Sequence, residues 1–414
     1  MNIVIAGEFT FPKGSANASR VRNIAKGLKE VGHNVYVLSM IPLKAENGAI
    51  RGIWQSYQGV KYCIAGVPIV LNAKASFVSK IVEYFRVFRK GLCNAVGFLD
   101  LLHKQEKIDA VIGYSYRYFS MNDLVKYCKK KQIIILRDVI EWFDPAFFLG
   151  GWLNPLYWDL ELNFHLSLPK SDGIIAISRF LTEKFSSKGM KVITIPAIID
   201  PDTFVMDVCE NIPSTGGLYQ LTYLGGMIER DGPMLMIKGI HEVLLSGAKV
   251  SFNIVGTDGS EGFAAKAKKY AYDHPLLKRH VKFWGRVPDE EVVRRLSWSD
   301  ALIFSRLESR DAKAAFPTRL PEYLMSGKPV ISSAVGDIPD YLIDGKEAII
   351  VKPNSAHALA EGIQRLLDMP DKGRSIGQAG LEKCRQCFNY YTRCEEISAF
   401  IEELLSTRHR KSIK

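Results

Sequence analysis

The sequence predicts an α/β protein built from two Rossmann-like, doubly wound domains that face each other across a cleft. Short apolar stretches of strand character alternate with helical periodicity along the 414 residues, and many of these stretches end in Gly or Ser. The alternation stops once, at a stretch of linker composition over residues 211–217. Repeated strand–helix units of this kind form parallel sheets, which bind ligands beyond the carboxyl ends of their strands.

The first expected domain covers residues 1–210. It opens with a strand at residues 3–6, a loop, a helix with apolar residues at steps of three and four, and a second strand at residues 34–38. Further strands are expected at residues 110–113, 133–136, 173–177 and 192–196.

The second expected domain covers residues 218–388. Strands are expected at residues 221–224, 250–255, 281–284, 301–304, 329–332 and 348–351, with a helix at 233–245. Residues 389–414 have the spacing of a final amphipathic helix.

Composition favours an ordinary globular protein in a reducing compartment. Hydrophobic residues make up 47% and charged residues 24% of the chain, and the start of the sequence has no signal-peptide pattern, which favours a cytoplasmic location. The seven cysteines are an odd number, as expected for reduced thiols. Cys384 and Cys387 form a lone CxxC, which we interpret as two helix cysteines, so no metal site is expected.

Residues 76–102 are too often interrupted by charges to cross a membrane. Aromatic and aliphatic residues recur on one face, with basic residues between them. This pattern fits a helix that lies on an anionic membrane surface, and it fits equally a core helix with a solvated basic side.

The net charge of +11 is concentrated in the first half, because residues 1–205 carry +9. Candidate partners of this basic half are an anionic lipid, a phosphorylated acceptor or nucleic acid. No nucleic-acid-binding motif accompanies the charge, so we do not expect a nucleic-acid partner.

Two segments have the composition of phosphate sites. Gly14 and Ser15 lie in a loop that leads into a helix, whose free backbone N–H groups favour an oxyanion, although a plain strand–helix turn fits as well. In the second segment, residues 315–330, a loop and helix start at Phe316 and Pro317, Thr318 follows, and Arg319 and Glu322 are three residues apart on one helix face. An Arg at a helix start suits a diphosphate, and the carboxylate suits ribose hydroxyls. A surface Arg–Glu pair is the simpler alternative.

Residues 315–330 resemble the donor-binding motif of retaining glycosyltransferases of family 4 (glycosyl transferases group 1), which have the two-domain GT-B fold. Other parts of that family resemble residues 171–181 with 195–196 and 199–200, and residues 281–285 with 299–303. The likeness extends over nearly the whole chain. It implies transfer of a sugar from a UDP- or GDP-sugar to a hydroxyl acceptor, saccharide or lipid-linked, without a metal or cofactor. It also implies polysaccharide or glycolipid biosynthesis, peripheral attachment to the cytoplasmic membrane face, and a final helix packed on the first domain.

The resemblance also assigns roles to residues. Glu322 matches the family's ribose-binding glutamate, and Gly14 matches the loop that closes over the donor. Gly225 and Gly226 follow the first strand of the second domain, and Gly285 lies beside the expected base-binding backbone.

The chain departs from the family pattern at three positions. Ala314 stands where the first glutamate of the motif is expected, so Glu308 or Asp311 would have to reach the sugar. Gly226 and Asp231 stand where the family has Arg and Lys. Replacements for these two cations are found among Arg230, Lys313 and Arg319.

The catalytic groups are expected in two places. Arg319, with Arg230, would neutralise the leaving diphosphate. Many relatives carry a histidine after a central strand of the first domain; the corresponding residues 136–142 contain none, and Asp138 and Glu141 are the nearest acidic groups. Structural carboxylates at these two positions are the alternative, and His165 is a further candidate.

Two other functions use the same nucleotide site. A GT-B sugar-nucleotide epimerase would need no acceptor, and a non-catalytic nucleotide-sugar-binding protein would fit the loss of a glutamate at Ala314. A dehydrogenase is excluded by the missing dinucleotide fingerprint.

Overall fold

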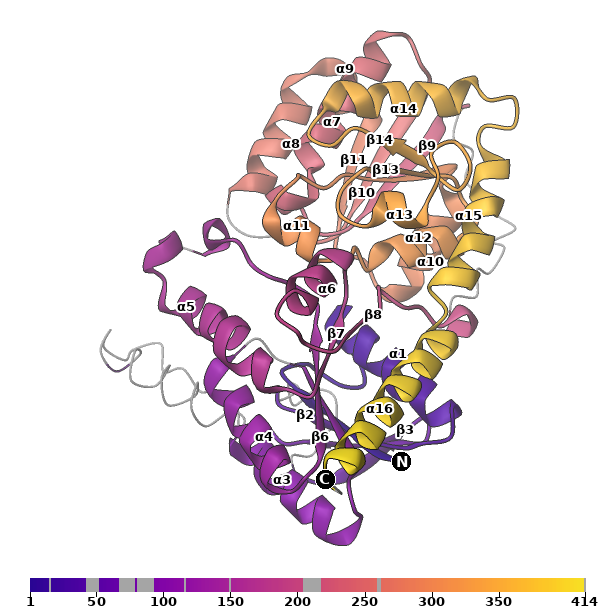
Figure 1. Ribbon diagram of the computed structural model, residues 1–414. Coiled ribbons are helices and arrows are strands. Elements are labelled where there is room, and N and C mark those ends of the chain that lie inside the picture. The colour runs from indigo at the N-terminus through magenta and orange to yellow at the C-terminus, as the bar shows by residue number, and fades with distance from the viewer. Residues whose placement is uncertain are drawn as a thin grey trace. The chain divides into compact units, whose positions relative to one another are not determined.

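The computed structural model describes residues 1–14, 16–41, 52–66, 79, 93–114, 117–148, 150–203, 217–258 and 262–412. The chain forms two compact units (Figure 1). Unit 1 comprises Met1–Ile198 and Tyr390–Lys414, and unit 2 comprises Ile199–Asn389. Ser15 and most of residues 76–102 lie outside the described residues.

Unit 1 contains an eight-stranded sheet with the strand order β3-β4-β2-β1-β5-β6-β7-β8. All neighbouring pairs are parallel except β3 and β4, an edge hairpin that the sequence did not reveal. The strands are β1 (Asn2–Gly7), β2 (Asn34–Ser39), β3 (Trp54–Tyr57), β4 (Val60–Ile64), β5 (Ala110–Tyr114), β6 (Ile134–Val139), β7 (Gly173–Ala176) and β8 (Val192–Thr194).

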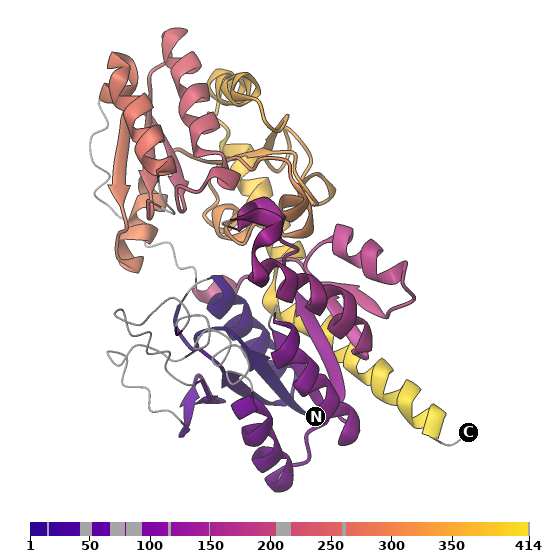
Figure 2. The same cartoon turned by 90° about the vertical axis from the view of Figure 1, so that its left-hand side faces the viewer.

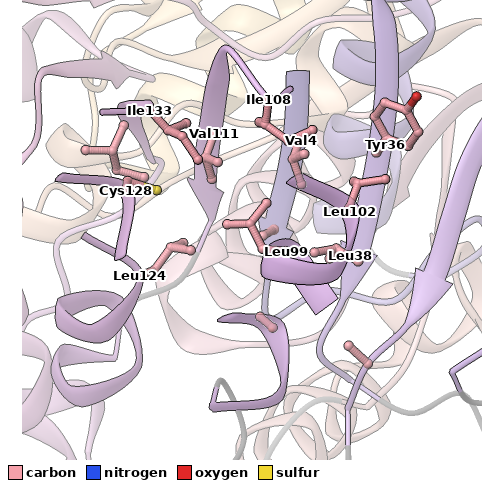
Figure 3. Close-up of a cluster of buried hydrophobic side chains, with 14 of the residues drawn as sticks. Val4, Tyr36, Leu38, Leu99, Leu102, Ile108, Val111, Leu124, Cys128 and Ile133 are labelled. Atoms are coloured by element: carbon pink, nitrogen blue, oxygen red, sulfur yellow. The ribbon is translucent and has the colours of Figure 1, made fainter. Parts of the chain in front are cut away.

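Helices cover this sheet, and apolar side chains from β1, β2 and β5 meet those of α3 and α4 in a buried core (Figure 3). This packing explains the helical spacing of apolar residues between the strands. The helices are α1 (Ala16–Glu30), α3 (Cys93–Gln105), α4 (Tyr118–Lys130), α5 (Pro155–Leu162), α6 (Arg179–Ser186) and α16 (Tyr390–Ser412), with short helical turns η2 (Pro145–Phe147), η3 (Gly151–Leu153), η4 (Asn163–Ser167), η5 (Leu168–Lys170) and, in unit 2, η6 (Pro201–Thr203).

The final helix α16 packs along α1 of unit 1 (Figures 1 and 2). Gly27 of α1 allows this close approach, because a Cβ there would lie 2.5 Å from the Cys394 sulfur. Arg408 near the end of α16 forms a 2.7 Å ion pair with Asp172. The last helix of the chain therefore belongs to the first unit.

Unit 2 contains a six-stranded, all-parallel sheet with the order β11-β10-β9-β12-β13-β14. The strands are β9 (Tyr219–Leu224), β10 (Val250–Val255), β11 (Val281–Gly285), β12 (Ala301–Phe304), β13 (Val330–Ser333) and β14 (Ile349–Val351). The helices are α7 (Pro233–Leu245), α8 (Phe263–Asp273), α9 (Pro275–His280), α10 (Asp289–Trp298), α11 (Arg310–Ala314), α12 (Arg319–Met325), α13 (Ile338–Tyr341), α14 (Ala356–Asp368) and α15 (Arg374–Cys387), with one short turn, η7 (Glu229–Asp231).

This strand order reverses its direction of growth between β9 and β12, which are neighbours in the sheet. Such a switch point leaves a crevice at the carboxyl ends of the two strands, because the following connections run to opposite sides. Unit 1 has its own switch point between β1 and β5. The predicted α/β class with two doubly wound sheets is confirmed.

No described helix is long and apolar enough to cross a bilayer. Cys384 of the CxxC lies on α15, is buried, and donates a hydrogen bond to the Pro321 carbonyl of α12. Burial raises the pKa of its thiol to about 12. This cysteine therefore stabilises the packing of α15 on α12.

Candidate functional site

Charged side chains gather at the switch point of unit 2. Gly225 and Gly226 follow β9, and Ser305 and Arg306 follow β12. The crevice expected from the strand order is therefore bordered by the loop of Gly225 and Gly226, two of the residues that the sequence predicted to contact the donor.

Arg319 is the central cation of this cluster. Its Nη1 donates to the Asp231 carboxylate and to the Tyr223 hydroxyl, each at 3.0 Å. Burial alone would lower the pKa of Arg319, but Tyr223 and Asp231 outweigh it and raise the pKa. The guanidinium is therefore permanently charged, and its position is fixed by two partners.

The helix α12 places this guanidinium. Tyr323, one turn after Arg319, accepts a 2.6 Å hydrogen bond at its hydroxyl from the Leu224 amide at the end of β9. Residues four apart share a helix face, so the same face that is tied to β9 carries Arg319. Glu322 lies outside this buried face and is exposed.

Gly225 is required by the same arrangement. A Cβ at this position would lie 2.6 Å from both the Arg319 guanidinium carbon and the Tyr223 hydroxyl. The glycine next to it, Gly226, offers its carbonyl to the Tyr223 hydroxyl at 2.9 Å. Gly225 therefore lets the Arg319 guanidinium approach the backbone closely.

Asp231 has a structural explanation. It is buried, accepts from Arg319, and lies 4.0 Å from the Arg306 guanidinium. The loss of the family's lysine at this position is thus matched by a carboxylate that holds another cation. In this chain the cation of the site, Arg319, comes from α12, whereas the family pattern has a cation directly after the strand that corresponds to β9.

The other predicted cations have carboxylate partners. Arg230 forms a 3.5 Å ion pair with the buried Asp311. Lys313 forms a 2.7 Å ion pair with Glu308, and the side chains of Lys313 and Glu308 are both half-exposed. Ala314 is fully buried at the end of α11. Asp311 is therefore bound to Arg230, and Glu308 remains the more accessible of the two carboxylates proposed to reach the sugar.

The remaining predicted donor residues lie at loop positions. Gly285 ends β11 with φ +67° and accepts a hydrogen bond from the Gly256 amide. Thr318 precedes α12 and makes no side-chain cap. Gly14 lies in unit 1 just before α1, while Ser15 is outside the described residues.

Asp138 does not have the surroundings of a catalytic acid. Its side chain is fully buried and forms a bidentate pair with Arg20, whose Nε and Nη2 lie 2.8 and 2.9 Å from the two carboxylate oxygens. Arg20 also donates to the carbonyls of Ile195 and Pro196. These contacts favour the structural alternative, in which Asp138 is the anion of a buried ion pair with Arg20.

Glu141 and His165 lie close to the same strand end in unit 1. Glu141 is half-buried and, with Asp138, lines a cavity of about 20 Å³ beyond β6. His165 is half-exposed and contacts Glu161 at 3.1 Å. Glu161 also accepts from the Trp142 indole, so His165 belongs to a local network on the surface.

Asp159 was not identified as a candidate from the sequence, because no motif includes it. It is 6% exposed, lies near Glu8 and Arg117, and accepts a 3.3 Å hydrogen bond from the Tyr118 amide. Burial raises its pKa to about 6, Arg117 opposes this shift and Glu8 adds to it. Glu8 and Arg117, an ion pair at 3.4 Å, follow β1 and β5 and so mark the switch point of unit 1. A carboxyl group that titrates near pH 6 in this place is a candidate for acid–base work.

Asp159→Asn should stabilise unit 1 at pH 8 but not at pH 4. The raised pKa means that the folded protein favours the protonated carboxyl, whose contribution is complete below pH about 4 and is lost as the pH rises through 6. The amide of the variant does not ionise and therefore does not lose stability as the pH rises. Its free energy of unfolding should exceed that of the wild type by roughly 1–3 kcal/mol at pH 8. Urea unfolding at both pH values measures the difference. The exposed Asp123→Asn is the control, and an Asp159 effect that is equal at both pH values would contradict the assignment.

Comparison with known proteins shows which family the second half of the chain resembles. Residues 211–383 match the family described as "Glycosyl transferases group 1". The D-rhamnosyltransferase WbpZ of Pseudomonas aeruginosa is 34% identical over 161 residues, which are 38% of this chain and 40% of WbpZ. A D-inositol 3-phosphate glycosyltransferase of Corynebacterium aurimucosum is 24% identical over 191 residues, 45% of this chain and 43% of that protein. The chain thus matches about two-fifths of the length of these relatives.

Solved structures resemble the chain over its full length. Sucrose-phosphate synthase from Thermosynechococcus elongatus superposes with a TM-score of 0.71 at 18% identity, covering 98% of this chain and 99% of that one. Anabaena HepE, in complex with UDP and glucose, gives 0.70 at 14% identity, covering 97% and 100%. These likenesses establish the fold. Unit 2 of this chain is therefore a glycosyl transferases group 1 domain, and the chain as a whole has the GT-B fold.

Proposed function

We propose that this chain is a retaining glycosyltransferase that moves a sugar from a nucleoside diphosphate sugar to a hydroxyl group of a saccharide or lipid-linked acceptor. The observation that carries the proposal is the guanidinium of Arg319, held by Asp231 and Tyr223 at the switch point of a group 1 domain. Polysaccharide or glycolipid biosynthesis is the process in which such a transfer is expected.

The role of Arg319 follows from where charge develops. When the bond between the anomeric carbon and the diphosphate oxygen breaks, negative charge grows on the leaving diphosphate. A fixed cation that needs no reorganisation stabilises that charge strongly in a site from which water is excluded. Asp231 positions Arg319 before the donor binds, and Glu322, exposed on the same helix, is available to the ribose hydroxyls.

Uridine is the first candidate for the donor base, because HepE is described in complex with UDP and with UDP-glucose. Thermal unfolding in the presence of UDP, GDP, ADP and their sugars tests the proposal. A nucleotide at a hundred times its Kd should add about 2.7 kcal/mol to the free energy of unfolding. Failure of every nucleotide to stabilise the protein would refute a nucleotide site.

Incubation of the responding sugar nucleotide alone distinguishes an epimerase, which would interconvert two sugar nucleotides. Failure of every acceptor to yield product would favour a binding protein.

A membrane surface is our candidate location for a lipid-linked acceptor. Unit 1 exposes a group of large apolar side chains on η2, η3, α5 and η4, which we call the aromatic surface: Phe147, Trp152, Leu153, Trp158, Leu162 and Leu166. Trp152 is 60% and Leu153 89% exposed, and the Trp158 indole donates to the Trp152 carbonyl, so the two rings are neighbours. Exposed Trp beside aliphatic residues is typical of segments that enter the headgroup region.

The double variant Trp152→Ala/Leu153→Ala should reduce binding to phosphatidylglycerol vesicles at least tenfold, because burial of each large apolar side chain contributes about 1.5–3 kcal/mol. Vesicle co-sedimentation measures this. The matched control is Leu245→Ala/Tyr272→Ala, two exposed apolar residues of unit 2. Equal losses in both double variants, or no binding by the wild type, would rule the aromatic surface out.

A further inference from the structure

Unit 2 contains a second cavity that the proposed transfer reaction does not use. It has a volume of about 240 Å³ and lies against β9, β10, β11 and α10. Eleven residues line it: Leu218, Gln220, Thr222, Ser251, Asn253, Arg279, Lys282, Trp284, Arg295, Trp298 and Ser299. None of them belongs to the Arg319 cluster.

The sheet presents an unusual face to this cavity. Two alternating residues are polar in each of β9 (Gln220 and Thr222) and β10 (Ser251 and Asn253), and side chains two apart point to the same face of a strand. Thr222, Ser251 and Asn253 are buried on that face, whereas Leu221 and Phe252 are buried on the other. Parallel strands buried on both faces usually read as unbroken apolar runs. The polar face is therefore a feature that packing alone does not require.

The polar side chains form a connected floor. Asn253 donates to the Gln220 side chain at 3.1 Å and accepts from the Trp284 indole at 3.0 Å. The Ser299 hydroxyl donates a 2.5 Å hydrogen bond to the hydroxyl of Thr222 on β9. The buried Trp298 indole N–H has no hydrogen-bond partner among the described residues. Buried donors are nearly always satisfied, so this one calls for an oxygen atom inside the cavity.

Three cations border the cavity, and its described lining contains no carboxylate. The Arg295 guanidinium is stacked 3.4 Å from the centre of the Trp284 ring, and its Nε is held by Glu291 at 2.7 Å. Arg279 and Lys282 form no ion pair with any described residue. A pre-positioned guanidinium together with two uncompensated cations favours a multiply charged anion.

We propose that this cavity binds a small phosphorylated sugar. The phosphate would be held by Arg279, Lys282 and Arg295, and the sugar hydroxyls by the amide and hydroxyl floor around Asn253. The volume lies below the range of about 300–1,000 Å³ that is typical of larger ligands, which fits a monosaccharide phosphate. The site is separate from the Arg319 cluster and does not depend on the proposed transfer reaction.

Isothermal titration of the full chain with glucose 6-phosphate, glucose 1-phosphate, inorganic phosphate and glucose, each with and without excess UDP, tests the proposal. We expect saturable binding of at least one sugar phosphate, unaffected by UDP. Inorganic phosphate should bind at least tenfold more weakly, and glucose should not bind measurably. The double variant Arg279→Ala/Lys282→Ala should weaken sugar phosphate binding at least tenfold. The matched control Lys249→Ala/Lys278→Ala removes the same charge from exposed positions outside the cavity and should leave the affinity unchanged.

Three results would overturn the proposal: displacement of the sugar phosphate by UDP, an equal loss in the control double variant, or no binding of either sugar phosphate by the wild type. Equal affinities for inorganic phosphate and sugar phosphates would overturn the assignment of the polar floor to the sugar. Trp298→Phe keeps an aromatic ring at this position but removes the indole N–H, and it should weaken binding severalfold without unfolding the unit. Because the titration is also run without nucleotide, it remains informative if the nucleotide site itself is disproved.

Discussion

Arg319→Ala should lower kcat by a factor of about ten to a thousand, with a smaller change in KM. The guanidinium stabilises charge that appears on the diphosphate only as the sugar leaves, so its loss raises the barrier more than it weakens the bound ground state. Removal of one such donor in other enzymes costs about 3–4 kcal/mol. Initial rates with the donor identified by thermal unfolding measure the effect.

Two further variants make this result specific. Arg319→Lys keeps the charge but loses the two-partner geometry with Asp231 and Tyr223, so it should recover only part of the rate. Arg365→Ala removes a half-exposed arginine of the same unit, paired with Asp344, and should be neutral. Unchanged turnover in Arg319→Ala would remove this residue from the mechanism.

Asp138→Ala should destabilise unit 1 by about 3–5 kcal/mol, because it leaves the buried Arg20 guanidinium without its counter-ion. Urea unfolding measures the change. Arg20→Ala should have a similar cost, and the double variant should cost less than the two single variants added together, since both remove the same interaction.

This experiment also separates the structural from the catalytic reading of Asp138. A variant with wild-type stability and a hundredfold lower kcat would restore Asp138 as a catalytic residue. A destabilised variant that retains turnover at low temperature would confirm its role in holding α1 to β6 and to the Ile195 and Pro196 carbonyls.

Most of the fold was predictable, because parallel strands and their helices are local patterns. The predicted bounds are correct for three elements: the strands at 250–255 and 301–304 and the helix at 233–245. Each of the other predicted strands differs from the observed one by one to three residues at one or both ends. The β3–β4 hairpin was missed because its strands, residues 54–57 and 60–64, are short and lie at the edge of the sheet. Edge strands carry little of the apolar periodicity on which such predictions rest.

The candidate site was predictable only in part. Arg319 and Glu322 stood out because they share one helix with a recognisable motif. Asp231 looked like a missing cation in sequence, and its role as the partner of Arg319 depends on a contact across 88 positions. The two roles considered for Asp138 could not be separated for the same reason, since its partner Arg20 lies 118 positions away. The raised pKa of Asp159 comes from burial, which no local pattern reveals.

The central claim is that a nucleoside diphosphate binds at the carboxyl ends of β9 and β12, against Arg319. Hydrogen–deuterium exchange with and without UDP, or the nucleoside diphosphate that stabilises the protein most, tests it directly. We predict slower exchange of the backbone amides of residues 225–232 and 316–324, and weaker protection of residues 316–324 in Arg319→Ala at a saturating nucleotide concentration. Protection confined to other parts of the chain, or no protection under conditions where the nucleotide stabilises the protein, would contradict the claim.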